Sequence, residues 1–299
     1  MQLAILAVFP AISGTALWMS AAGLALLAIA LLAARNDIAK ACGIDKFAAL
    51  THPCFGIPLA VFGAEHLSSP HPLLAAVPSY MPWRLFWVYF VGLALIAASL
   101  SIAARRQVRW SGQLFGAMMF LFVAMLHLPG ALKAGGRIPW TIVFREMSFG
   151  GAGWVLAGIA IRRDREVQGK GLIAVGRVPI AIAAIFFGAE HFLHPLGLPG
   201  VPLVKEMPTW IPFRAFIDYV TGGALVVGGV CFLLARKTRE AARLVGAWIV
   251  LLVVVIYGPV LIGSLADPRA GVQVEGINYF ADTLLFGGVI LSLAGVNRK

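Results

Sequence analysis

Two copies of a short motif hold the residues of this chain that are best suited to chemistry. The sequence FGAEH occurs twice, with Glu65 and His66 in the first copy and Glu190 and His191 in the second. An imidazole can ligate a metal or haem and can relay protons. A carboxylate within an apolar helix is costly, so its repetition suggests a need that both copies share.

Each glutamate has an arginine as its expected partner. Arg84 and Arg214 begin the apolar segments that follow the two motifs. We therefore predict ion pairs between Glu65 and Arg84 and between Glu190 and Arg214, each closing one helical bundle. Such pairs satisfy buried charges without implying catalysis, so the cluster is a candidate for either a functional or a structural role.

Two further polar residues differ between the copies. His127 is expected at the same membrane face as His66, and the two could meet, but Tyr257 takes the place of His127 in the second copy. A symmetric bis-histidine site is therefore not supported, and no metal site is predicted. Asp218 lies four residues after Arg214, a spacing at which helical side chains pair. Haem and quinone stay open as cofactors.

A site for a lipophilic small molecule is an alternative use of the same region. Such a site needs an apolar cleft with a few polar groups. Aromatic residues follow both motifs, namely Tyr80, Trp83, Trp87, Tyr89, Trp210, Phe213 and Tyr219. Because tryptophan and tyrosine also gather at membrane interfaces, anchoring in lipid would explain them as well.

Membrane-spanning helices are the elements that must position these residues. Of the 299 residues, 60% are hydrophobic and 12% are charged, and the mean hydropathy is +0.89. Soluble domains are about 25% charged. A spanning helix needs about 20 mostly apolar residues. Nine segments fit, and they are 12–34, 47–67, 84–104, 111–132, 145–161, 172–193, 213–235, 244–264 and 279–296.

The distribution of basic residues predicts the orientation of an all-α, multi-pass protein in a bacterial inner membrane. Seventeen of the 24 lysines and arginines fall on one side of the predicted spans. Basic loops stay in the cytoplasm, which places the N-terminus in the periplasm and the C-terminus in the cytoplasm. The net charge of +11 is explained in this way, with the lipid bilayer as partner and without nucleic acid.

An internal repeat organises the nine spans. GAMMFLFVAMLHLPGAL at 116–132 aligns with GAWIVLLVVVIYGPVLI at 246–262, and FGG at 149–151 aligns with FGG at 286–288. Four spans per copy is an even number, so the copies insert in parallel. We predict two parallel four-helix bundles plus one N-terminal helix. The predicted units are residues 1–46, the first repeat 47–161, a linker 162–177 and the second repeat 178–299.

The order of the motifs resembles that of the DoxX-like family of bacterial membrane proteins. FGAEH is followed by HPL, by MPxW-like segments and by a helix ending in HLP or YGP. The family's name derives from a subunit of a thiosulfate:quinone oxidoreductase, so the resemblance implies a tandem pair of four-helix units and a quinone-linked or redox-associated component. A transporter or lipophile-binding protein and a non-catalytic partner of another membrane protein are the alternatives. Nucleotide-binding and hydrolase motifs are absent from the sequence.

Overall fold

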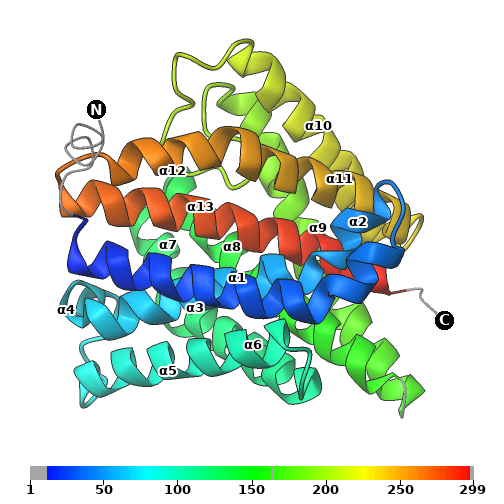
Figure 1. Cartoon of the computed structure of the whole chain (residues 1–299), viewed down its shortest axis with the longest axis horizontal. Helices are drawn as coiled ribbons and strands as arrows, with labels where there is room; N and C mark the ends of the chain where they lie inside the picture. Colours follow the sequence, from blue (N-terminus) through cyan, green and yellow to red (C-terminus); the bar gives the residue numbers. More distant parts are fainter. Residues whose placement is uncertain (1–11, 163–164, 297–299) are drawn as a thin grey trace, which may run out of the picture.

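Long helices packed side by side make up the computed structural model, which describes residues 12–162 and 165–296 (Figure 1). No strand occurs among these residues, so the all-α prediction is confirmed for them. The α-helices of the first part are α1 (Gly14–Lys40), α2 (Asp45–Ala49), α3 (Thr51–Ser68), α4 (Pro70–Leu73), α5 (Arg84–Ala103), α6 (Val108–Phe122), α7 (Leu128–Ala134) and α8 (Arg137–Ile161). Those of the second are α9 (Glu166–Leu193), α10 (Arg214–Leu233), α11 (Thr238–Leu252), α12 (Gly258–Leu265) and α13 (Ala270–Ser292).

Seven helical segments in the described residues are long and apolar enough to cross a membrane. They are α1, α5, α6 with α7, α9, α10, α11 with α12, and α13. Large apolar side chains such as Leu24, Leu114 and Val254 are exposed on them, which is the surface that contact with lipid requires. The other two predicted spans, 47–67 and 145–161, correspond to α3 and α8, which are not among these seven segments. The count of nine spans therefore stays a prediction.

The fourth helix of each predicted repeat packs against the other repeat as well as its own. Within the first repeat α3 packs on α5, and α6 packs on α8; within the second α9 packs on α10, and α11 packs on α13. In addition α8 packs on α9, α13 packs on α3, and α8 contacts α13. Figure 1 shows α13 between α12 on one side and α1 on the other. The helices of the two predicted repeats are therefore joined through α8 and α13.

Unusual backbone geometry recurs at one constant spacing along the chain. Non-glycine residues adopt the left-handed conformation at Trp83, Arg105 and Gln107, and again at the equivalent Phe213, Ala235 and Lys237. These are all the non-glycine residues with positive φ in the described part of the chain. Turns of π-helix lie at Val123–His127 and Val253–Tyr257, with the same spacing. The two predicted repeats thus turn and bulge at corresponding positions.

The glycine of each FGAEH motif allows a close approach of two helices. A Cβ on Gly63 of α3 would lie 2.9 Å from the carbonyl oxygen of Gly92 on α5. A Cβ on Gly188 of α9 would lie 2.7 Å from the carbonyl oxygen of Gly222 on α10. Small residues permit such backbone contact between membrane helices. Gly223, by contrast, has open space around it.

The predicted linker between the two repeats is mostly helical in the structure. Within this linker, 162–177, α9 begins at Glu166 and its first turn is supported by a Lys170–Glu166 ion pair of 2.7 Å. No proline interrupts the helix before Pro179. The predicted N-terminal unit 1–46 is described only from residue 12 onward, and the ends of the chain and residues 163–164 lie outside the described residues.

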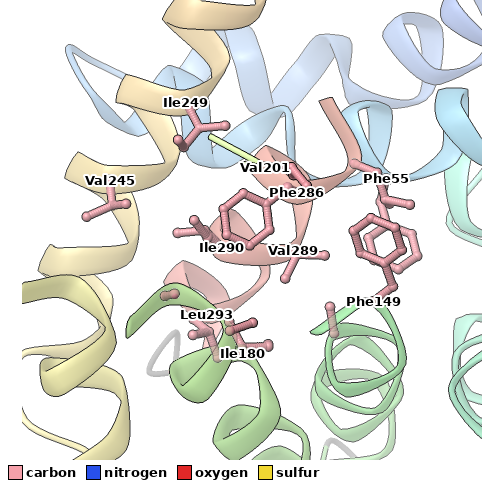
Figure 2. Packing of buried hydrophobic residues seen from close by; sticks show 14 of the residues in the cluster. Phe55, Phe149, Ile180, Val201, Val245, Ile249, Phe286, Val289, Ile290 and Leu293 are labelled. Carbon is pink, nitrogen blue, oxygen red and sulfur yellow. The ribbon is translucent and has the colours of Figure 1, made fainter. Parts of the chain in front are cut away.

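The core is apolar and aromatic and draws on both repeats. Figure 2 shows Phe55 from α3, Phe149 from α8 and Ile180 from α9 in one cluster with Phe286 and Ile290 from α13. Every residue of α13 from 281 to 292 is buried. This apolar layer therefore fills the interior between the two ends of the bundle.

Candidate functional site

Both motif glutamates bind the fourth helix of the opposite repeat. We call the end of the bundle at which α3 and α9 terminate the motif end, and the opposite end the basic end. Asn278 Nδ2 of α13 donates to Glu65 Oε1 at 3.2 Å. Arg137 Nη1 of α8 lies 3.4 Å from Glu190 Oε2, and His194 Nε2 lies 3.7 Å from the same oxygen. The motif thus links the two repeats in a reciprocal manner.

A three-residue ion cluster joins α8 to α13 deeper in the bundle. Arg145 Nη1 donates to Asp282 Oδ2 at 2.7 Å, and Arg145 Nη2 donates to Glu146 Oε1 at 2.7 Å. Asp282 lies about 18 Å along α13 from its first residue, close to the middle of the helix. One guanidinium faces two carboxylates here, and all three side chains are at most 17% exposed. Charges at this depth are costly unless they pair, so the cluster fixes α8 against α13.

His191 and Asp218 form a buried polar pair within the second repeat. His191 Nδ1 lies 3.1 Å from Asp218 Oδ1, and both side chains are inaccessible to solvent. The backbone N–H of Gly200 donates to His191 Nε2 at 3.0 Å. The carbonyl oxygen of Gly200 also lies 3.3 Å from Nε2, so Gly200 meets this ring nitrogen through both of its backbone groups. Both ring nitrogens are engaged, so this histidine holds the loop in place and is not poised to accept a substrate proton.

The segment between α9 and α10 is inserted into the bundle, whereas the corresponding segment of the first repeat is not. Leu198, Val201 and Met207 are each 1% exposed and belong to the core. Tyr257 donates to the carbonyl of Pro199 at 2.9 Å. The two connecting segments therefore differ, because the segment between α3 and α5 is mostly exposed.

The predicted pairs Glu65–Arg84 and Glu190–Arg214 are wrong. Arg84 donates to the carbonyls of Leu74 and Val77 in the preceding segment. Arg214 donates to the carbonyl of Met207 at 3.1 Å in the corresponding place. Each arginine follows a left-handed residue that folds its loop back over the helix start, so loop carbonyls satisfy the guanidinium. The predicted helical pair of Arg214 with Asp218 gives way to the His191–Asp218 pair.

The remaining predicted histidines have separate local environments. His66 Nδ1 lies 2.8 Å from the carbonyl oxygen of Phe62, one turn earlier in α3. His127 lies in a π-helical turn, within electrostatic range of Glu146 and Arg145. Among the described residues no group of three or more His, Cys, Asp or Glu side chains is arranged to hold a metal ion.

A pocket of about 360 Å³ adjoins the ion cluster at the motif end. Leu203, Val204 and Val274 supply apolar walls, and Asn278 and Asp282 supply polar groups. It therefore combines apolar surface with a few polar groups, as a small-molecule site requires.

Sequence reasoning overlooked Arg137, Arg145 and Asn278 as parts of the site. Arg145 is an ionisable residue at the start of a predicted span, which is itself a signal of function or pairing. It also aligns with Asp282 in the second repeat, in the same register that aligns the two FGG segments. Paired charges of opposite sign at equivalent positions indicate contact near an axis that relates the two copies. Asn278 carries no comparable signal.

Comparison with known proteins returned no match among protein-family models, curated proteins or solved structures.

Proposed function

We propose that this chain is a DoxX-like, nine-span protein of the bacterial inner membrane, built from two duplicated four-helix units. The recurrence of left-handed residues and π-turns at one constant spacing supports the duplication. α3 and α8 complete the count of nine, and they tolerate polar residues because their buried faces contact helices instead of lipid. The excess of basic residues at one end places that end, with the C-terminus, in the cytoplasm and the N-terminus in the periplasm.

Within this frame, the geometry best supports a membrane carrier for a small molecule that passes between the two repeats. The observation that carries this proposal is a cavity of about 1330 Å³ at the basic end, lined by residues from both repeats. Carriers built from repeats place their substrate sites at the interface between the repeats. The apolar layer around Phe286 separates this cavity from the pocket at the motif end.

Polar links across the repeats give the carrier an outer gate. Arg145 and Asp282 connect α8 to α13, while Glu65 and Glu190 each bind the opposite repeat. The closed links at the motif end and the open cavity at the basic end support a carrier state that faces the cytoplasm. Breaking one buried pair by removing a partner costs about 3–5 kcal/mol, which is enough to reverse a two-state equilibrium.

Accessibility of single cysteines tests this function without knowledge of the substrate. In a background without native cysteines, Ala160→Cys reports on the inner cavity and Thr141→Cys on the buried motif end of α8. An impermeant maleimide is applied from each side of the membrane. Asp282→Asn is expected to raise outer labelling of Thr141→Cys at least tenfold and to lower inner labelling of Ala160→Cys. Asp267→Asn is the matched control, because Asp267 pairs only with Arg269 in its own exposed turn among the described ion pairs.

The reciprocal change is what distinguishes a carrier from a rigid scaffold. If Asp282→Asn alters neither labelling rate, or raises both, the gate and the carrier are refuted. A scaffold that assembles with another membrane protein predicts unchanged rates, and a loosened fold predicts that both rise.

The pocket at the motif end supports a second candidate function, a quinone-linked or redox-associated component. Tyr279 and Asn278 place polar groups beside apolar walls, as a quinone headgroup requires. Solvent extraction of the purified protein followed by mass spectrometry is expected to yield quinone, and less of it from Asn278→Leu. A colourless preparation free of quinone and haem would exclude this candidate.

A further inference from the structure

The cavity at the basic end has a wall rich in arginine. It lies between the ends of α1, α5, α8 and α13 and the starts of α3, α6, α9 and α11. The polar residues with donor groups that line it include Arg105, Arg109, Arg162, Arg239, His52 and Gln107. The cavity therefore presents donors for an anion at the end of the bundle where the charge is positive.

The acidic residues of the wall are already neutralised. Their basic partners are Arg105 for Asp37, Arg243 for Asp45 at 2.8 Å and Lys170 for Glu166 at 2.7 Å. Two of these partners, Lys170 and Arg243, come from outside the lining, so they add positive charge around the cavity. The net field inside the cavity is consequently positive.

Arg109 and Arg239 are equivalent residues of the two repeats and face the same cavity. Their spacing along the chain is the one at which the left-handed residues recur, and each lies in the first turn of its helix. Neither forms an ion pair with a carboxylate in the part of the chain that the structure describes. A cation in the first turn opposes the helix dipole, so this placement costs helix stability in both predicted repeats.

Two arginines of the cavity wall also have a buried Nε donor without an acceptor. The Nε atoms of Arg239 and Arg105 are buried and have no hydrogen-bond partner among the described residues. A buried donor without an acceptor is costly, and a bound anion would remove that cost. Guanidinium groups suit phosphate and carboxylate because they donate in a planar fork.

The inner wall of the same cavity is apolar. Leu156, Ile159 and Ala160 of α8 line it together with Ala294 near the end of α13. Its volume of about 1330 Å³ exceeds the roughly 300–1,000 Å³ of ordinary small-molecule pockets. The cavity thus has room for an apolar chain next to its cationic rim.

We propose that this cavity binds an amphipathic anion, whose phosphate or carboxylate is held by Arg109 and Arg239 and whose apolar chain lies along α8. Basic pockets between membrane helices at the cytoplasmic face suit anionic headgroups. The claim that this ligand is the cargo of the carrier rests on the proposed function, whereas the claim that the cavity binds it does not.

Binding of defined probes to the purified full chain in a neutral detergent tests the proposal. The probes are dioleoylphosphatidylglycerol, dioleoylphosphatidylcholine, oleate and inorganic phosphate, and the readouts are native mass spectrometry and the shift of the unfolding temperature. The anionic lipid or oleate is expected to bind, whereas the zwitterionic lipid is expected to bind at least tenfold more weakly. Inorganic phosphate that binds as tightly as the lipid would refute the role of the apolar chain.

Charge-removing variants locate the site. Arg239→Gln and Arg109→Gln are each expected to weaken binding of the anionic probe about 10- to 100-fold, the loss of one hydrogen-bonded charge contact. Arg236→Gln is the matched control, since Arg236 is exposed in the turn before α11 and is not part of the cavity wall. It is expected to change binding less than twofold. If Arg239→Gln does not fold, Arg109→Gln still tests the site, because Arg109 is exposed. Unchanged binding of the anionic probe in the variants that fold would overturn the proposal.

This binding assay and the accessibility assay fail independently. If the probes bind without specificity but the two labelling rates still change in opposite directions, the amphipathic ligand is refuted and the carrier is kept. Specific, arginine-dependent binding without reciprocal labelling would keep the ligand site and refute the carrier.

Discussion

The glycine of the second FGAEH motif offers a quantitative test of the helix packing. In Gly188→Ala the new Cβ would lie 2.6 Å from Val226 Cγ2, 2.7 Å from the carbonyl oxygen of Gly222 and 2.9 Å from the backbone nitrogen of Val226. Ordinary contact begins at 3.4 Å, so α9 and α10 must move apart by several tenths of an ångström. Two of the three close atoms are backbone atoms, which cannot rotate away.

The expected free-energy change follows from two opposing effects. Overpacking costs about 1–3 kcal/mol, whereas replacing glycine by alanine in a helix gains up to about 1 kcal/mol. Gly188→Ala is therefore expected to lower the free energy of unfolding by about 1–2 kcal/mol. Gly63→Ala should cost less, since two of its three close atoms belong to the rotatable side chain of Ile96.

Reversible unfolding by dodecyl sulfate in mixed micelles, followed by tryptophan fluorescence, measures these differences. Gly223→Ala is the matched control, because Gly223 neighbours Gly222 on α10 and a Cβ there has open space. It should leave the protein equally stable or slightly more stable. If Gly188→Ala were as stable as Gly223→Ala, the close contact between α9 and α10 would be refuted.

Three further predictions concern the polar residues and the orientation. Glu190→Gln should lower the free energy of unfolding by about 1–2 kcal/mol, because Arg137 loses its negatively charged partner. Glu65→Gln keeps an acceptor for the side-chain amide of Asn278 and should cost less. Comparable losses in equilibrium unfolding would contradict this order. Asp218→Leu should cost about 1–3 kcal/mol by removing the buried polar partner of His191 Nδ1, and Asp218→Asn should cost less, as checked by thermal unfolding. An impermeant maleimide should label the exposed Cys42 in inverted but not in right-side-out vesicles, and the opposite pattern would reverse the proposed orientation.

Much of the fold follows from local sequence features. Each predicted span coincides with a helix, because runs of apolar residues long enough to cross a bilayer must satisfy their backbone hydrogen bonds internally. The repeated motif also fixed two glycine contacts, at Gly63 and Gly188, since only small residues allow backbones to approach closely. A small residue in an apolar helix does not by itself mark a contact, since a Cβ at Gly223 would meet open space.

The partners of the polar residues depend on how each helix is rotated about its axis. Hydropathy does not reveal this rotation, so the sequence suggested the nearest arginines, Arg84 and Arg214, as partners of the two glutamates. In the structure the glutamates face α13 and α8 of the opposite repeat, and loop carbonyls satisfy both arginines. The partners of both glutamates were therefore decided by which neighbouring helix each glutamate faces.

The sequence by itself determined that this is a helical membrane protein with a repeated Glu-His motif, because length, hydropathy and repetition are properties of the chain. Only the tertiary structure decided that the motif joins α3 and α9 to α13 and α8, that the segment between α9 and α10 enters the core, and that Arg109 and Arg239 face one cavity. These features arise from contacts between residues far apart in the sequence. Such contacts are set by the close packing of helices around α8 and α13, which no local pattern records.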